Sequence, residues 1–208
     1  MKRYDISQEV FSCAVYPGDP VPQKEVLLSM NDGAVCNLTG VSMCAHNGTH
    51  IDAPYHFLNN GNTVDELGLE PFVGMAYVIG HQGIVSGADA ERILEKAGEG
   101  VLSDCRNQQL NEKNEPKRIL IKGNAEVSLE AAEVFARAKL FLLGNESQTV
   151  GPEDAPMAVH KVLLGAGTVL LEGIRLTDVP EGAYLLSAAP LNLAGGDGAP
   201  CRAVLLEL

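Results

Sequence analysis

Residues 45–57 constrain the fold more than any other part of the chain. This segment holds three of the five histidines, and both Asn47-Gly48 and Pro54 interrupt it at intervals too short for a helix. The mostly apolar residues 35–45 lead into it and are compatible with a β-strand. We therefore expect the histidines to lie on extended or looped backbone.

Three side chains of this segment are expected to converge. Alternate side chains of an extended strand share a face, so His50 and Asp52 project to the same side. A turn at Asn47-Gly48 can fold His46 back beside them. Imidazole nitrogens and carboxylate oxygens suit zinc, manganese or iron, and three protein ligands leave one coordination position for water. The competing interpretation, ordinary polar residues in a surface loop, does not explain this density of ligands.

The expected chemistry is hydrolysis, because a metal lowers the pKa of a bound water from about 15.7 to about 7 and can polarise a carbonyl. Two distant residues can extend the site. Glu172 ends the apolar run 169–171, where a carboxylate is costly to bury unless it is paired or bound to a cation. His160 lies on an apolar helical stretch, where a satisfied core histidine is the usual explanation. Together with the first cluster they can complete a second metal position, with Asp52 bridging the ions.

The 208 residues and the 46% hydrophobic share fit one globular domain, residues 1–208. Strands outnumber helices and do not alternate strictly with them, which favours a mixed α/β domain with flanking helices over a doubly wound one. We expect helices at residues 89–96, 128–138 and 151–164, strands at 77–80, 118–122, 141–144 and 168–172, and a final antiparallel pair, 184–193 with 200–208, across a turn at 195–198.

The net charge of −12 and the scattered basic residues argue against a nucleic-acid partner. Met1-Lys2-Arg3 is followed at once by Tyr4-Asp5 rather than by an apolar signal segment, and no apolar run reaches the roughly 20 residues that a spanning helix needs. We therefore expect a cytoplasmic protein with no membrane partner, which acts on a small molecule.

Five widely spaced cysteines argue against a disulfide framework and against a cysteine-based zinc site. We expect each to be a small buried apolar residue in a reducing compartment. Cys44 beside His46 also offers a cysteine nucleophile, although no activating helix terminus is evident there. The five are Cys13, Cys36, Cys44, Cys105 and Cys201.

Residues 46–57 resemble the signature of the cyclase family of metal-dependent hydrolases, whose best-known members are bacterial kynurenine formamidases. That signature, His-x-Gly-Thr-His-x-Asp-x-Pro-x-His-Phe, is matched at every fixed position. The similarity extends to Pro17-Gly18-Asp19, to His160 and Glu172, and to the tail at residues 190–202, so that it covers nearly the whole chain.

The resemblance implies a swivelling β/β/α fold, a homodimer or higher homo-oligomer, and two divalent metal ions, which are zinc or alternatively manganese. It implies that His46, His50 and Asp52 bind one ion. It implies that Asp52, His160 and Glu172 bind the other.

The implied reaction is cleavage of a carbon–nitrogen bond in an amide or formamide, as by an arylformamidase acting on N-formyl-L-kynurenine in tryptophan breakdown. His56 would be the proton shuttle to the departing nitrogen; the alternative is an outer residue that orients a ligand. Formamidase-like members carry Trp before Pro-Gly-Asp and a Ser-Val-Asp element, where this chain has Tyr16 and residues 147–150. An isatin hydrolase-like or other cyclic-amide hydrolase, and a catalytically silent metal- or ligand-binding member, are the remaining alternatives.

Overall fold

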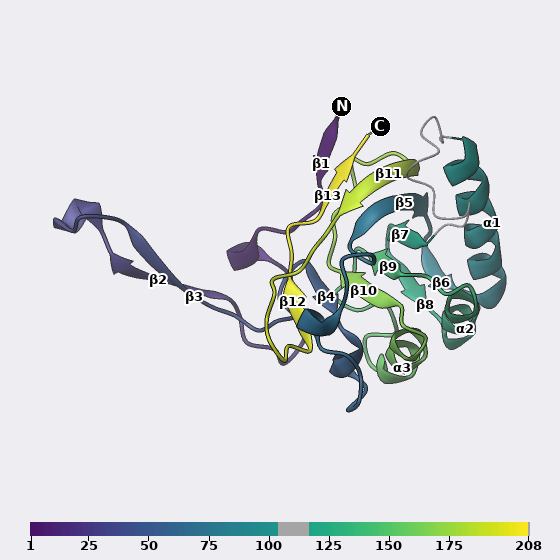
Figure 1. The fold of residues 1–208 in the computed structure, drawn as a ribbon, viewed down its shortest axis with the longest axis horizontal. Helices are drawn as coiled ribbons and strands as arrows, with labels where there is room; N and C mark the ends of the chain where they lie inside the picture. Colours follow the sequence, from purple (N-terminus) through teal and green to yellow (C-terminus); the bar gives the residue numbers. More distant parts are fainter. Residues whose placement is uncertain (104–116, 208) are drawn as a thin grey trace.

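The computed structural model describes residues 1–103 and 117–207, so that Cys105 lies outside it. Its centre is a curled sheet of nine strands in the order β1-β13-β11-β5-β7-β9-β10-β4-β12 (Figure 1). The strands are β1 Arg3–Asp5, β4 His50–Asp52, β5 Val73–Gly80, β7 Arg118–Lys122, β9 Leu142–Asn145, β10 Val169–Glu172, β11 Gly182–Ser187, β12 Gly198–Pro200 and β13 Val204–Leu206.

The middle of this sheet is parallel and its two ends are antiparallel. Strands β5, β7, β9 and β10 pair in parallel, while β4 pairs antiparallel with both β10 and β12. The parallel strands carry near-continuous apolar runs, as expected of strands that are buried on both faces. The arrangement confirms the expected mixed α/β fold with flanking helices.

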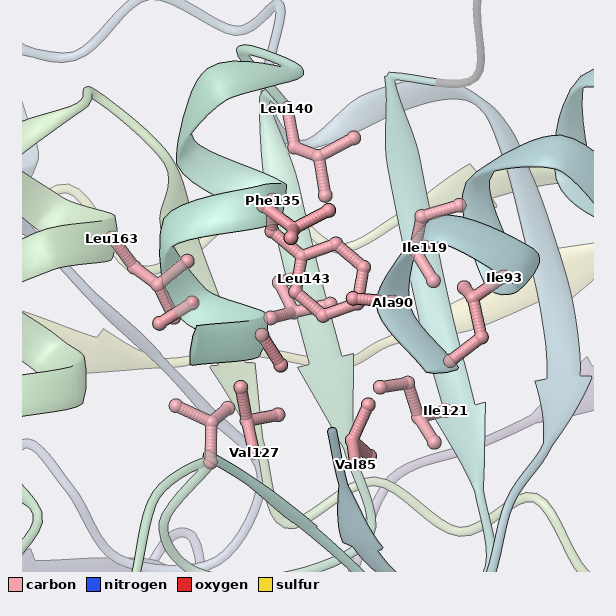
Figure 2. Packing of buried hydrophobic residues seen from close by; sticks show 14 of the residues in the cluster. Val85, Ala90, Ile93, Ile119, Ile121, Val127, Phe135, Leu140, Leu143 and Leu163 are labelled. Carbon is pink, nitrogen blue, oxygen red and sulfur yellow. The ribbon is translucent and has the colours of Figure 1, made fainter. Parts of the chain in front are cut away.

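Three helices, α1 Gly87–Ser103, α2 Leu129–Arg137 and α3 Met157–Gly165, pack on one face of the sheet (Figure 1). Figure 2 shows part of this core, where Phe135 of α2 and Ile93 of α1 lie over Ile119 and Leu143 of the sheet. Neighbouring strand residues such as Leu120 point to the opposite face and join a second buried cluster. Alternation along the strands therefore supplies two apolar layers from one sheet.

The short elements lie around this core. The strands β6 Gly83–Val85 and β8 Ala125–Val127 form a small parallel sheet. The strands β2 Gln23–Leu28 and β3 Leu38–Ser42 form a hairpin, the arm, which projects away from the body (Figure 1). Short 3-10 helices are η1 Val10–Ser12, η2 Met30–Asp32, η3 Pro54–His56 and η4 Val64–Glu66. Within the described ranges, no helix has both the length and the apolarity to cross a bilayer.

Two helix boundaries differ from the sequence prediction. The helix α3 begins at Met157 rather than at residue 151, because Pro156 disfavours helical backbone at Ala155, and residues 152–155 form a turn instead. The helix α1 starts two residues before the expected segment and continues to Ser103. The predicted pairing near the end of the chain is confirmed, since β11 pairs with β13.

The predicted full burial of the cysteines is wrong for the four described ones. Cys36 is exposed, while Cys13, Cys44 and Cys201 are only partly buried. All four are free thiols. Cys36 lies between β2 and β3, outside the core, which explains its exposure.

Candidate active site

The strand β4 carries His50 and Asp52 into the middle of the antiparallel end of the sheet. It lies between β10 and β12, and Glu172 of β10 pairs directly opposite His50. Directly opposed residues of neighbouring strands present their side chains on the same face. The pairing register therefore brings a carboxylate from 122 positions along the chain beside the histidine.

His46 joins them because the chain turns between residues 46 and 50. Gly48 has a φ of +67°, a backbone conformation that glycine adopts without strain. The turn places Nδ1 of His46 at 2.8 Å from Oδ1 of Asp52. Nε2 of His50 lies 3.3 Å from the same oxygen and 3.5 Å from Oε2 of Glu172. The predicted convergence of these side chains is observed.

His160 approaches from α3, and its position completes the cluster. Its Nε2 lies 3.2 Å from Oε1 of Glu172 and 3.6 Å from Oδ2 of Asp52. The backbone N–H of Val150 donates to the same Glu172 oxygen at 2.8 Å. The structure thus brings both distant residues, His160 and Glu172, to the segment that carries His50 and Asp52.

Backbone carbonyls select which nitrogen of two imidazoles faces the cluster. Nδ1 of His50 donates to the carbonyl of Gly48 at 3.0 Å, and Nδ1 of His160 donates to that of Pro156 at 2.9 Å. In the neutral form of each ring, the form that binds a metal, the unprotonated nitrogen is then Nε2, which faces the carboxylates. Such a contact to the remote nitrogen is what orients histidine ligands in metal sites.

A divalent metal ion fits these donors. Oδ2 of Asp52 is buried and has no hydrogen-bond partner among the described residues, which is costly for a carboxylate oxygen. Ligand atoms of His50, Asp52 and Glu172 lie within 4.8 Å of one another, as do those of His46, Asp52 and His56. The Nε2 atoms of His50 and His160, together with the carboxylates of Asp52 and Glu172 that lie beside both rings, are a suitable donor set for zinc or manganese.

His56 lies at the edge of this cluster, together with a carboxylate that sequence reasoning missed. Its ring stacks on His46 with centroids 4.0 Å apart. Oδ2 of Asp197 accepts hydrogen bonds from Nδ1 of His56 at 3.2 Å and from Nε2 of His46 at 2.9 Å. The sequence predicts only a turn at residues 195–198, with no part in the site. In the sequence, the feature that could have pointed to Asp197 is a carboxylate with a glycine on each side, in a turn.

The carboxylates give the cluster a strong preference for positive charge. Burial lowers the pKa of His46 and His50, but hydrogen bonds outweigh burial and raise these pKa values to about 9 and about 10. The partners are Asp197 and Asp52 for His46, and Asp52 and Glu172 for His50. Conversely, burial is the dominant influence on His56 and lowers its pKa. A divalent cation meets the same electrostatic demand as these protons.

A cavity of about 330 Å³ opens onto the cluster, which is within the size range of small-molecule sites. Its walls include the rings of Tyr16 and Phe57, and the hydroxyl of Tyr16 donates to the carbonyl of Glu153 at 2.6 Å. Cys44 lies nearby, but burial raises the pKa of its thiol and Asp19 raises it further. A raised pKa is the opposite of what a nucleophilic thiolate needs, which argues against the cysteine mechanism.

A family described as "Putative cyclase" matches residues 4–152 of the chain, a span that includes His46, His50, Asp52 and His56. The chain belongs to the cyclase family. The resemblance seen in the sequence is thereby confirmed.

Cyclase-family relatives match along the whole chain. A kynurenine formamidase from Salinibacter ruber is 37% identical over 100% of this chain and 98% of its own length. A kynurenine formamidase from Erythrobacter litoralis is 30% identical over 99% of this chain and 94% of its own length. The similarity therefore extends beyond the histidine segment to α3 and β10, which carry His160 and Glu172.

Solved cyclase-type structures share the fold. A potential metal-dependent hydrolase with cyclase activity is 26% identical, covers 98% of this chain and 96% of its own, and superposes with a TM-score of 0.74. An isatin hydrolase bound to thioisatinate superposes with a TM-score of 0.79 over 99% of this chain and 92% of its own, at 16% identity. At that identity, the likeness to isatin hydrolase is one of fold alone.

Proposed function

We propose that this protein is a metal-dependent amide hydrolase of the arylformamidase type, which cleaves the carbon–nitrogen bond of N-formyl-L-kynurenine or a close analogue. One observation carries the proposal: imidazoles and carboxylates from four separate segments meet around an oxygen of Asp52 that no other described residue satisfies with a hydrogen bond, beside a cavity of substrate size. The two kynurenine formamidase relatives, which match over nearly their whole length, support the same chemistry.

Two divalent ions would share Asp52. Its Oδ1 faces His46 and His50, whereas its Oδ2 faces His160, so the two oxygens of one carboxylate address two sets of ligands. We assign His46, His50 and Asp52 to one ion, and Asp52, His160 and Glu172 to the other. When bound, zinc or manganese ions in this position polarise the substrate carbonyl and activate water.

The remaining residues bind the substrate and transfer protons. Phe57 packs edge-on against the ring of His56 at 4.5 Å between centroids, and Tyr16 and Pro156 line the same cavity. These flat apolar walls suit an aryl ring, whose amide then lies against the cluster. We assign proton transfer to the departing nitrogen to His56, because burial lowers the pKa of this imidazole and so keeps it neutral and able to accept a proton that it then passes on.

The direct test is formate release from N-formyl-L-kynurenine by protein loaded with zinc or manganese. We expect turnover that is lost after treatment with a chelator and restored by either metal. Isatin and simple cyclic amides are assayed in parallel. Turnover of isatin alone would replace the arylformamidase assignment by a cyclic-amide hydrolase, and turnover of neither class would leave a metal-binding protein without hydrolase activity.

We propose a homodimer on the basis of the arm. Every residue of β2 is exposed, including Val26, Leu27 and Leu28. An isolated two-stranded hairpin is marginally stable in water, and monomers rarely expose an apolar patch of this kind. A recess of about 650 Å³ beside the base of the arm is lined by Phe11, Met43 and other apolar residues. One chain thus carries both a projecting apolar arm and an apolar recess, which suits a two-fold pair of identical chains.

Replacing Val26 by Asp should convert the dimer to a monomer, because burying an unpaired carboxylate in the interface is costly. Light scattering on the purified protein measures the change, with the wild type giving the mass of two chains. Lys24→Gln, on the same exposed strand, is the matched control and should leave the mass unchanged. A wild-type mass of one chain would contradict the proposed dimer.

We also propose a cytoplasmic location and a single domain. The free thiols of Cys13, Cys36, Cys44 and Cys201 suit a reducing compartment. The nine-stranded sheet contains both the first strand, β1, and the last, β13, which supports a single folding unit.

A further inference from the structure

Asp197 is held rigidly beside the site by its neighbours in the chain. Its carbonyl accepts from the N–H of Ala53 at 3.0 Å, and Gly198 pairs with Asp52. A Cβ at position 198 would lie 2.5 Å from the carbonyl oxygen of Ile51, so only glycine allows this approach. The backbone of β4 therefore fixes the backbone at Asp197, and hydrogen bonds from His46 and His56 place its carboxylate.

This carboxylate controls the orientation of His56. A carboxylate oxygen only accepts, so the hydrogen bond of 3.2 Å between Nδ1 of His56 and Oδ2 of Asp197 requires the proton on Nδ1. Nε2 of His56 has no hydrogen-bond partner in the described part of the chain, and the residue lines the cavity. The hydrogen bond from His46 to the same oxygen, at 2.9 Å, holds the carboxylate at the edge of the two stacked rings.

We propose that Asp197 is a positioning residue that holds His56 with its proton on Nδ1, so that Nε2 faces the cavity ready to accept a proton. This inference rests on the proposed hydrolysis. As the oxygen of water bonds to the carbonyl carbon, Nε2 accepts the proton that water loses. As the C–N bond breaks, Nε2 returns that proton to the departing nitrogen. His56 ends in its starting form, and Asp197 stays ionised and stabilises the transient imidazolium.

The other tautomer could not perform the first of these steps. With its proton on Nε2, His56 would have no lone pair facing the cavity, and Asp197 would face an unprotonated Nδ1. A neutral carboxamide at position 197 would also lose the charge that stabilises the imidazolium. Removing Asp197 should therefore impair proton transfer more than substrate binding.

The ring nitrogens of His56 report the tautomer without any turnover. We would record long-range ¹H–¹⁵N correlation spectra of the zinc-loaded wild type, Asp197→Ala and Asp197→Asn, with His56→Ala to assign the signals. We expect the wild type to carry the proton on Nδ1 and the variants to lose that preference. A His56 signal that is unchanged in both variants would overturn the proposal. Because this measurement needs no substrate, it stands even where the proposed hydrolysis fails.

Turnover then tests whether Asp197 acts through His56. At saturating metal, Asp197→Ala should lower kcat on the order of 100-fold with little change in KM. In a His56→Ala background, the same change should have no further effect. A further loss of equal size there would show that Asp197 acts independently of His56, and the proposal would be wrong. If the Ala variant fails to fold, Asp197→Asn, which keeps the side-chain shape, replaces it in the comparison of kcat with and without His56.

The matched control is Asp65→Asn. Asp65 accepts from the N–H of Gly195 at 2.9 Å and so holds the same loop, and it accepts a second hydrogen bond from the hydroxyl of Thr63 at 2.7 Å rather than from a histidine. We expect this variant to keep the wild-type His56 tautomer and kcat. A loss as large as that of Asp197→Ala would mean that loop order, rather than the carboxylate, is responsible, and would overturn the proposal.

Discussion

Replacing Asp52 by Asn should remove the bound metal and lower kcat/KM by roughly 1000-fold or more, because metal ions supply several kcal/mol of transition-state stabilisation. The two oxygens of Asp52 face different histidines, His46 and His50 on one side and His160 on the other. An amide cannot supply two anionic oxygens to two ions. Elemental analysis of the purified variant gives the number of ions per chain, and the formate assay gives the rate.

The control for this variant is Asp5→Asn, which removes another carboxylate far from the cluster. Asp5 accepts from Nε of Arg202 at 2.9 Å in an exposed ion pair, which contributes little to stability because solvent screens it. Its metal content and rate should equal those of the wild type. An Asp52→Asn protein with full metal content and full activity would place the ions elsewhere.

Replacing His56 by Ala should lower kcat by about 10²- to 10⁴-fold while the protein keeps its metal, since general acid–base catalysis contributes a factor of that size. His56 lies at the edge of the cluster, where its Nδ1 contacts Asp197 rather than Asp52 or Glu172. Its removal therefore leaves the five assigned ligands in place. Rates at saturating substrate and metal, together with elemental analysis, measure both parts of this expectation.

His81→Ala is the matched control for that change. His81 follows β5 in an exposed loop, where its Nε2 contacts the carbonyl of Ile84 at 3.2 Å, away from the cavity. It should retain the wild-type rate. If the His56→Ala protein loses its metal, His56 is instead a metal ligand. The geometry allows this alternative, because a ring nitrogen of His56 lies within 4.8 Å of ligand atoms of His46 and Asp52.

The sequence predicts the centre of the site well, because local geometry decides it. Extended backbone through residues 50–52 places His50 and Asp52 on one face, and the glycine turn returns His46 to them. The mixed fold follows from apolar runs such as Leu142–Asn145 that do not alternate strictly with helices. Both features depend on neighbours in the chain, which a single sequence displays.

What the sequence does not predict depends on contacts between distant segments. Asp197 lies 141 positions from His56, and only the pairing of β12 with β4 brings the two together. The start of α3 shifts because Pro156 outweighs the helix-favouring acids before it. The strand β2 is exposed because the arm projects away from the body of the protein. Neither the strand propensity of its residues nor the spacing of its apolar residues indicates the direction in which a hairpin projects.

The position of β4 between β10 and β12 affects when the protein can become active during its synthesis. Residues 50–52 leave the ribosome long before residues 169–172 and 198–200, the segments with which they pair. Domains assemble as units once their parts have emerged. A nascent chain therefore holds all five assigned ligands once Glu172 is made, but β4 lacks β12, one of its two neighbours, until residues 198–200 follow. A chain cut short before residue 198 would leave His50 and Asp52 on an unpaired edge of the sheet.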